Sequence, residues 1–391
     1  MTELSQTAQH GLSAHSHGAG VPLQIRSERV RSASVADFVA ITQREEQWRY
    51  LPTDRLGDLV DDVLAEFSGD IALKAPDSVT TAWVGREHSA FGAAGLPEDR
   101  VSASGWASAE AAYLVTIPSN SEPDCQVQLS VVSEDDTASA LHVIVEAKTH
   151  SKAVVVLDHR GKAVLSENVE ILVGDEADLT LVSIQDWDEN SVHVASHFCK
   201  LGRNSKLKHI VISLGGKTVR ITPSVEYTGT GGDAELLGMY FADAGQHLEH
   251  RPYIDHSVPN CKSRVTYKGA LQGEKAHTVW VGDVLIRKEA EGTDTYELNR
   301  NLLLTDGARA DSVPNLEIET GKIEGAGHAS ASGRFDDEQL FYLQARGISE
   351  SEARRLVVYG FLNEIIQQIG VAEIEARLTE SIEAELARSV H

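Results

Sequence analysis

The 391-residue sequence has few of the features that identify common classes of enzyme or binding protein. It contains three cysteines, Cys125, Cys199 and Cys261, which are far apart, odd in number and without a Cys-x-x-Cys pair. A disulfide framework and a zinc site built from this chain alone are therefore both disfavoured. A reducing cytoplasm is the compartment that fits this cysteine usage.

Long apolar runs and basic character are also missing. No stretch of about 18 apolar residues occurs, so we expect no membrane-spanning helix. The first residues lack a basic segment followed by an apolar one, so we expect no secretory signal. Lys and Arg number 35 against 59 Asp and Glu, which gives a formal charge of −24. So acidic a chain is unsuited to general binding of nucleic acid or anionic membranes.

Sequence motifs of several enzyme classes are absent. The sequence holds no G-x-x-x-x-G-K-[ST], no G-x-S-x-G and no H-E-x-x-H. The glycine-rich GTGG at 229–232 lacks the surroundings of a dinucleotide-binding fingerprint, and we interpret it as a hairpin or corner. The chain is therefore not expected to be a P-loop ATPase itself.

Composition and periodicity divide the chain into four parts. A polar start rich in Gly, Ser and His predicts a disordered tail, and Val, Ile and Thr at period two predict a long β core between two helical parts. The predicted segments are a disordered tail at 1–22, an N-terminal helical region at 23–79, a β core at 80–335 and a C-terminal helical domain at 336–391.

The two helical predictions rest on start signals and apolar spacing. Ser34 and Asp37 suit a helix start, and TDRLGDLVDDVLAEF places apolar residues near one face. In the C-terminal part, Ser349 and Glu352 have the spacing of a capping box. An acidic start in DDEQLFYLQARG and a glycine at its end are also typical of a helix.

The turns of the β core show a repeat. Small residues follow polar turns and precede strands at Ala177, Ser205, Ala234 and Ser263, with separations of 28, 29 and 29. Stacked coils of a β-solenoid need such tight, small corners, so the spacing favours a solenoid. A large antiparallel sandwich is the alternative. A doubly wound α/β sheet is disfavoured, because convincing helices between the strands are missing.

One segment of the β core concentrates metal-ligating side chains. QHLEHRPYIDHSVPNCKS contains His247, His250, His256 and Cys261, and imidazole and thiolate are ligands for iron or zinc. His247 and His250 are three apart, which points them to opposite faces of an extended chain. A corner between His256 and Cys261 could bring these two together, so they are kept as weaker ligand candidates.

His328 is the stronger candidate. Its neighbours Ala326, Gly327 and Ala329 have little side-chain bulk, so a partner molecule could approach it closely. One imidazole cannot hold a metal tightly, because a site needs several converging ligands. His328 would therefore complete a site whose other ligands come from another chain.

The region around His328 resembles the C-terminal signature of SufD, in the SufB/SufD family of iron–sulfur cluster assembly proteins. The family pattern is P-x-L-E-I, then H-G-A-T, then D-E-Q-[LI]-F-Y-L and R-G. The matching positions are Pro314, Leu316–Ile318, His328, Asp337–Leu343 and Arg346–Gly347. REEQWRYLP resembles the family's E-x-W-R-Y, and HSVPNCKSR and ELNRNLLLTDGARADSVPNLEI resemble its β core. The resemblance covers about residues 30 to 370, although H-G-A-T is His-Ala-Ser-Ala here.

The resemblance implies a fold and a role. It implies a right-handed parallel β-helix flanked by helical domains, and a non-catalytic scaffold subunit in a complex with SufB and the ATPase SufC. In that complex clusters are built with sulfur from a cysteine desulfurase. No cofactor is expected to bind stably to this chain alone; a transient iron ion or iron–sulfur cluster, and FAD as a further candidate, belong to the complex. The isolated chain could form a homodimer, because the SufB and SufD surfaces are related.

The resemblance also implies site residues. His328 becomes a candidate iron or cluster ligand at the SufB interface, and SufB-type members carry a cysteine near the equivalent histidine, where this chain has Ala326. The SufC contact falls in the C-terminal helical domain. Its candidate residues are Phe335, Asp337, Leu340, Phe341, Leu343 and Arg346.

Two other functions stay open at this point. The first is a structural partner of an ATPase in which His328 has no ligand role. The second is a β-helix enzyme acting on carbohydrate, which needs paired carboxylates on one sheet face. The expected lack of a secretion signal counts against the second.

Overall fold

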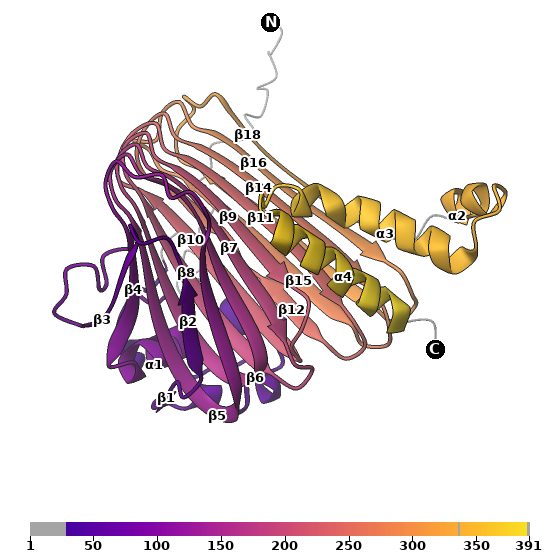
Figure 1. The fold of residues 1–391 in the computed structure, drawn as a ribbon. Coiled ribbons are helices and arrows are strands. Elements are labelled where there is room, and N and C mark those ends of the chain that lie inside the picture. The colour runs from indigo at the N-terminus through magenta and orange to yellow at the C-terminus, as the bar shows by residue number, and fades with distance from the viewer. Residues whose placement is uncertain (1–28, 335–336, 389–391) are drawn as a thin grey trace, which may run out of the picture.

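The body of the protein is a parallel β-solenoid of about eight turns (Figure 1). The computed structural model describes residues 29–334 and 337–388, so the predicted tail at 1–22 lies outside the described residues. Successive coils pair in parallel, with a repeat of 26 residues at Lys152↔Asp178 and 32 at Lys262↔Asp294. The predicted solenoid is confirmed, and the antiparallel sandwich is wrong.

Each full coil contributes one strand to each of two ladders that face each other across the core. The first ladder contains β5 (Val127–Ala147), β6 (Lys152–Val173), β7 (Asp178–Trp187), β9 (Lys206–Ser213), β11 (Asp233–Ala242), β14 (Lys262–Leu271), β16 (Asp294–Leu303) and β18 (Gly325–Arg334). The second contains β4 (Ala111–Ile117), the later halves of β5 and β6, β8 (Val192–Leu201), β10 (Thr218–Tyr227), β12 (His247–His250), β13 (Tyr253–His256), β15 (His277–Ile286) and β17 (Arg309–Ile318).

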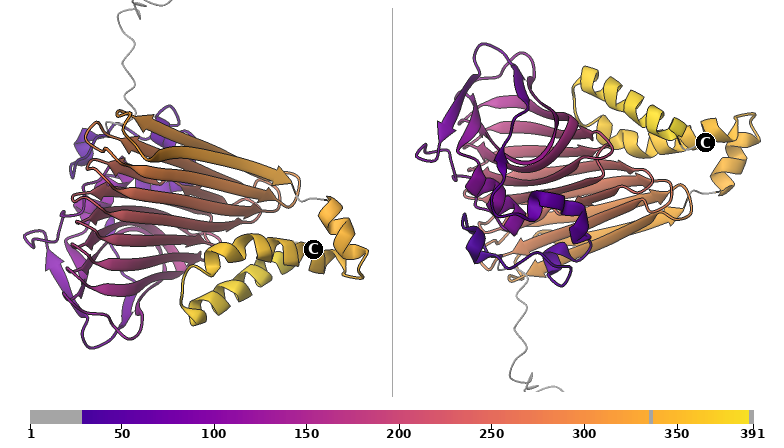
Figure 2. Two further views of the ribbon diagram at one scale, coloured as in Figure 1. Left: turned by 90° about the horizontal axis from the view of Figure 1, so that it is seen from above. Right: turned by 90° about the horizontal axis from the view of Figure 1, so that it is seen from below.

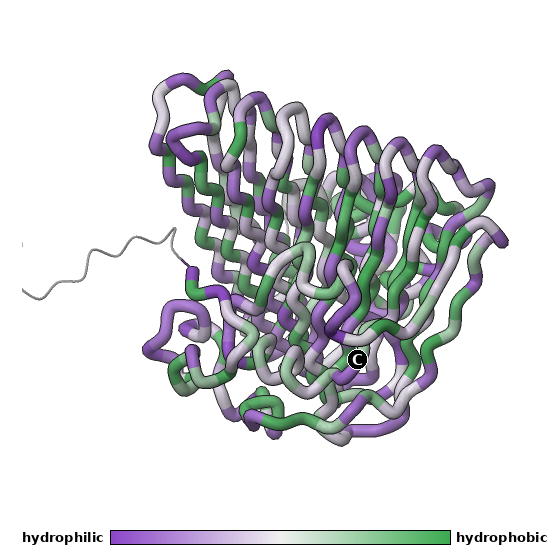
Figure 3. Tube along the Cα trace, turned by 90° about the vertical axis from the view of Figure 1, so that its left-hand side faces the viewer, coloured by the Kyte–Doolittle hydropathy of each residue, from purple (hydrophilic) through white to green (hydrophobic). Residues whose placement is uncertain are grey.

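The two ends of the solenoid differ. At the first end, β2 (Asp70–Lys74) and β3 (Thr80–Gly85) pair antiparallel with β5 and β4, and β1 (Ala65–Glu66) pairs in parallel with β5. Phe67 and Leu73 pack there against the core. At the other end the last coil consists of β17 and β18. Figure 3 shows the successive coils side by side, with their corner loops in a row.

One corner of each coil contains a residue with positive φ. Examples are Glu176, Asn204, Gly231 and Asn260, with φ values of 57°, 52°, 78° and 59°. The backbone N–H of Asn204 donates to the carbonyl of Thr230 in the next coil at 2.9 Å, and equivalent bonds run from Glu176 to Arg203 and from Asn260 to Glu291. Asn and Gly tolerate this left-handed conformation best, which explains their place in the turns.

The predicted corner residues are all buried, but they do not occupy one equivalent position. Ala177 and Ser205 directly follow the positive-φ residue, whereas Ala234 and Ser263 are already the second residues of β11 and β14. The residues that occupy the same corner position as Ser205 in these two coils are Gly232 and Cys261. Each directly precedes a first strand residue, and these first residues, Lys206, Asp233 and Lys262, pair with one another along the ladder. The repeat was therefore real, although its register was offset in two coils.

Helices cover the outer faces of both ladders. The C-terminal part forms α2 (Asp337–Gln344), α3 (Glu350–Ile366) and α4 (Ala372–Arg388). Leu362 and Ile382 pack on Ile184 and Ile212 of the first ladder. The capping box is partly seen, since the Ser349 hydroxyl accepts the backbone N–H at the third helical position. Two salt bridges to the solenoid, Arg377–Asp158 at 2.7 Å and Lys268–Glu364 at 2.5 Å, hold α4 and α3 in place.

The N-terminal region differs from the helical region predicted at 23–79. Its described part holds only short 3₁₀ helices, η1 (Val35–Asp37), η2 (Glu46–Trp48) and η3 (Thr53–Val60), followed by β1 and β2. Gly57 has φ 55° and ψ −136°, which interrupts helical geometry, and Val63 is 81% exposed instead of lying on a buried face. Pairing of β1 with β5 then draws the following residues into the sheet, so tertiary contacts override the local pattern.

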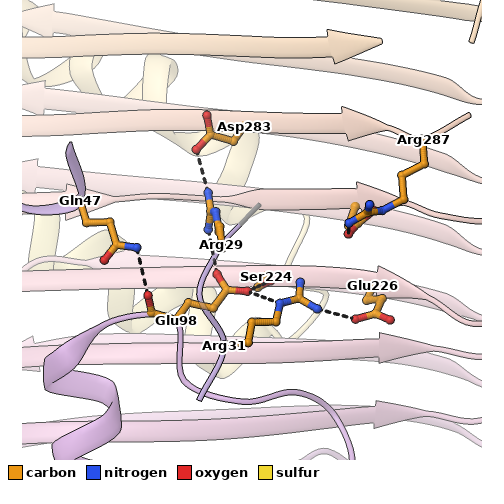
Figure 4. Close-up of polar contacts among 9 residues, drawn as sticks. Arg29, Arg31, Gln47, Glu98, Ser224, Glu226, Asp283 and Arg287 are labelled. Carbon is orange, nitrogen blue, oxygen red and sulfur yellow. Dashed lines mark hydrogen bonds and ion pairs between the residues drawn. The ribbon is translucent and has the colours of Figure 1, made fainter. Parts of the chain in front are cut away.

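These 3₁₀ helices, together with α1 (Arg100–Ser108), pack on the outer face of the second ladder through Trp48, Leu51 and Val101. Ion pairs add to this contact (Figure 4). Arg29 pairs with Glu98 at 2.9 Å and with Asp283 of β15 at 2.8 Å, and Arg31 pairs with Glu98 at 3.1 Å. The start of the described chain is thus fastened across several coils.

Candidate functional site

The last coil is the part of the solenoid where a ligand or partner has access. Among the described residues, β18 pairs with β16 on one side and with no strand on the other. His328 lies in β18 and is exposed, as are the residues that follow it in the strand. The predicted candidate therefore sits on an edge strand, whose free backbone groups are able to pair with another chain.

The His328 side chain belongs to the face of β18 that points into the solenoid. Residues paired in a parallel ladder point to the same side, and His328 pairs with the buried Glu297 of β16. The neighbouring inward positions agree with this orientation. Ser330 bonds Ser312 of β17 at 2.8 Å, and Ser332 accepts from the Asn301 side chain at 3.2 Å. His328 therefore covers the end of the interior.

Glu297 is a residue that sequence reasoning missed. It is only 2% exposed, and neither of its carboxylate oxygens has a hydrogen-bond partner among the residues that the structure describes. Burial, and secondarily the charge of Asp283, raise the pKa of Glu297 to about 8. A signal did exist in the sequence, because DTYELNRNLL alternates at period two and places this glutamate at an inward position.

The two weaker candidates lie in the interior. His256 bonds the Ser263 hydroxyl through Nε2 at 2.9 Å and stacks on Tyr227, with ring centroids 4.9 Å apart. Burial lowers the pKa of His256 to about 3. Cys261 is buried in the main core, its thiol lies 3.5 Å from the carbonyl oxygen of Gly229, and burial raises its pKa. The structure therefore places this pair away from the exposed edge that carries His328.

A second cluster that the sequence did not indicate has the residue types of a metal site. Ligand atoms of His159, Glu167 and His193 lie within 4.8 Å of one another, and all three side chains are buried inside the solenoid. Two histidines and one glutamate are a known zinc-binding set. The hydrogen bonds of His193, however, place a proton on the ring nitrogen that a metal would need.

The proton positions follow from the neighbouring groups. His159 donates through Nδ1 to the carbonyl of Ile184 at 2.9 Å, and His193 accepts the Trp187 indole N–H at its Nδ1 at 3.1 Å. The proton of His193 is therefore on Nε2, where it donates to Glu167 at 3.2 Å. A metal bound at Nε2 would leave the proton of neutral His193 on Nδ1. That proton would then face the indole N–H of Trp187, so two donors would oppose each other.

Charges in this cluster are consistent with an internal ion pair. Burial opposes ionisation of Glu167, but the charge of His159 and the bonds from both histidines lower the pKa of Glu167. Burial likewise opposes protonation of His159, yet the Glu167 carboxylate raises the pKa of His159, while burial lowers the pKa of His193. We therefore interpret the cluster as a satisfied structural network.

The residues predicted to contact an ATPase lie in and around α2, which projects beyond the solenoid body (Figure 2). Phe335 lies outside the described residues, and of Asp337 the structure describes only that it begins α2. Leu340 is buried against Ala353 and Leu343 is half-buried, so both serve internal packing.

The exposed side chains of α2 are aromatic and basic. Phe341 is 73% exposed, Tyr342 is 55% exposed, and the exposed Arg346 lies over the Tyr342 ring at 4.5 Å. Sequence reasoning missed Tyr342. Large apolar side chains gathered on one exposed helix are typical of an interaction surface. No helix among the described residues is long and apolar enough to cross a bilayer.

Comparisons with known proteins agree with one family. The model of the SUF system iron–sulfur cluster assembly SufBD core domain matches residues 130–361. A SufBD family protein of Mycobacterium tuberculosis is 51% identical over 369 residues, which cover 92% of this chain and 93% of that protein. A SufBD family protein of Mycobacterium leprae is 50% identical over 351 residues, 88% and 90% of the two chains. SufD of Bacillus subtilis is 28% identical over 277 residues, 68% and 62% of the two chains.

Proposed function

This chain belongs to the SufBD family of iron–sulfur cluster assembly proteins, and we propose that it is the non-catalytic SufD-type scaffold of a complex with SufB and the ATPase SufC. The observation that carries the proposal is the exposed His328 on the unpaired last strand, with its side chain at the mouth of the solenoid. Iron and sulfide are cargo in this proposal, and the chain keeps no resident cofactor.

The last coil is proposed to pair with SufB. Within the described chain, β17 and β18 each pair with a strand on one side only, and a second solenoid of the same family offers strands of matching spacing. Small side chains line this coil at Ala326, Gly327 and Ala329, so the partner backbone can come close to His328. Two related solenoids joined in this way give a pseudo-symmetric heterodimer.

His328 is proposed to ligate iron at this interface. Neutral imidazole is a good ligand for iron, and thiolates of SufB would supply the softer ligands. An exposed histidine on an edge strand contributes little to the packing of the chain itself. Its replacement should therefore affect the cargo more than the assembly.

The exposed face of α2 is proposed to dock SufC. Phe341 and Tyr342 are available for burial by a partner, and Arg346 adds a cationic group beside them. The other two helices are already committed to the solenoid through their apolar faces and salt bridges. Of the three C-terminal helices, α2 therefore offers the exposed aromatic face that a partner can cover.

The test is anaerobic co-purification with SufB and SufC from cells that co-express all three. His328→Ala should leave the complex assembled and lower its iron and acid-labile sulfide content. His88→Ala, which removes an exposed histidine far from the last coil, is the matched control. If His328→Ala has the cluster content of the wild type at equal protein level, the ligand role of His328 is refuted and only the scaffold role remains.

A further inference from the structure

Glu297 is an anomaly among the buried glutamates of the solenoid. The others have partners within hydrogen-bond distance: Glu167 has His159 and His193, Glu170 has His142 and two backbone N–H groups, and Glu249 has His247 and Arg251. Both oxygens of Glu297 lack one in the described structure. A buried polar group without a partner costs free energy, so its presence needs a physical reason.

The surroundings hold the carboxylate in a definite place. A Cβ at Gly282 of β15 would come within 2.3 Å of the Trp280 ring and 2.7 Å of a Glu297 carboxylate oxygen, so the ring and the carboxylate together fill the space that this glycine leaves. On the inner side, β16 pairs with β14, where Val265 is the partner of Glu297 and belongs to the apolar core. On the side toward the last coil, the ladder partner of Glu297 is His328, and no further strand of the described chain follows.

Glu297 and His328 are therefore neighbours on one face of one ladder. Paired residues of adjacent strands are about 5 Å apart at their Cα atoms, and both side chains point inward. The positions that flank them in the last coil, Ala326 and Ser330, are small. A cation placed between the carboxylate and the imidazole would meet an oxygen and a nitrogen ligand with little steric obstruction.

We infer that Glu297 is a second iron ligand of this chain, so that Glu297 and His328 form an oxygen–nitrogen half-site for a divalent iron ion. The inference rests on the proposed ligand role of His328 and adds a residue that no comparison assigns. Carboxylate and imidazole together are ligands that ferrous iron accepts. The ion would supply the positive partner that the buried carboxylate lacks, and the remaining ligands would come from the partner chain.

The test uses the purified full-length chain under anaerobic conditions, with Fe²⁺ itself as the probe and a chromogenic chelator as competitor. Glu297→Gln and His328→Ala should each weaken Fe²⁺ binding about tenfold or more, and the double variant should lose little beyond either single change. Glu274→Gln, at an exposed glutamate near the opposite corner, is the control and should bind like the wild type. Circular dichroism and the melting temperature check that each variant is folded.

The outcomes separate the two proposals. If Glu297→Gln binds Fe²⁺ like the wild type while His328→Ala does not, the role of Glu297 is overturned and that of His328 stands. If neither substitution changes binding, both ligand roles fail. The same variants in the complex with SufB and SufC give a second readout, the iron retained per complex, which should fall for both.

Discussion

The buried network of His159, Glu167 and His193 yields a prediction that separates an ion pair from a metal site. Replacement of Glu167 by alanine leaves His159 without its counter-charge in a place where all three side chains are inaccessible to solvent. Loss of one partner from a buried pair typically costs about 3–5 kcal/mol of stability. We expect Glu167→Ala to lose stability of this order, which makes it one of the most damaging single changes in the solenoid.

Glu167→Gln is the informative companion. A glutamine amide can donate to Nε2 of a neutral His159, while its oxygen still accepts the Nε2 proton of His193. The hydrogen bonds are thus kept and the charges removed together, so we expect a cost of about 1 kcal/mol, the usual worth of one hydrogen bond. A metal site would not distinguish the variants in this way, because neither alanine nor glutamine supplies a carboxylate ligand.

The pH dependence provides the second measurement. The pKa of His159 is raised in the folded state, so its contribution is complete below about pH 6.5 and is lost as pH rises through the folded pKa. The pKa of Glu167 is lowered, so its contribution is present above about pH 4.5 and is lost as pH falls through the folded pKa. Urea unfolding followed by circular dichroism should show this window in the wild type and a flatter dependence in Glu167→Gln.

Two results would contradict this reasoning. One is a cost below about 1 kcal/mol for Glu167→Ala, which would mean that the buried charge of His159 is tolerated alone. The other is an alkaline loss of stability that is the same in Glu167→Gln as in the wild type. Asp175→Asn, at a half-buried carboxylate of a neighbouring corner, serves as the control for general charge effects, because the asparagine oxygen can still accept the Arg203 backbone N–H.

Three further predictions concern other parts of the chain. Glu297→Gln should raise stability at neutral pH. The pKa of Glu297 is about 8 in the folded chain against 4.5 in the unfolded chain, so the native state loses stability as pH rises between these values, by about 3 kcal/mol at pH 7. Urea unfolding at pH 5 and pH 7 should therefore show the gain from the substitution only at the higher pH. Phe341→Ser with Tyr342→Ser should change the stability of the chain by less than about 0.5 kcal/mol and yet abolish co-purification of SufC; retention of SufC would exclude this face of α2. Arg377→Ala should cost about 1–3 kcal/mol of stability, because the buried Asp158 loses two hydrogen bonds. Limited proteolysis should then remove α4 from the rest of the chain sooner than it does in Arg354→Ala.

The sequence supported the fold better than the site, for physical reasons. Period-two strands and small corners are local patterns, and a solenoid repeats them, so Ala177 and Ser205 carried real information about the coil. The helical prediction for the N-terminal region was wrong, because the course of this region is set by pairing of β1 with a strand about 75 residues away.

Interior polar contacts could not be read from the chain in the same way. Glu167 meets His159 within one long strand but meets His193 only across the spacing of a whole coil. Glu297 and His328 are likewise one coil apart, and their relation depends on the register of β16 with β18. Register follows from the stacking of all earlier coils, and no short motif encodes it. The prediction of His328 rests on its small neighbours and on the family resemblance, both of which are local.

The one-sided pairing of β18 has a consequence for dynamics. In an array where each coil touches only its neighbours, the terminal unit has one interface instead of two, so its opening free energy is lower than that of any inner coil. Amide hydrogen exchange should therefore be graded along the solenoid and fastest in β17 and β18. A partner strand on β18 would turn this frayed end into an inner coil and slow its exchange. The precision with which His328 is held would then be a property of the assembly, acquired at the moment the two chains join.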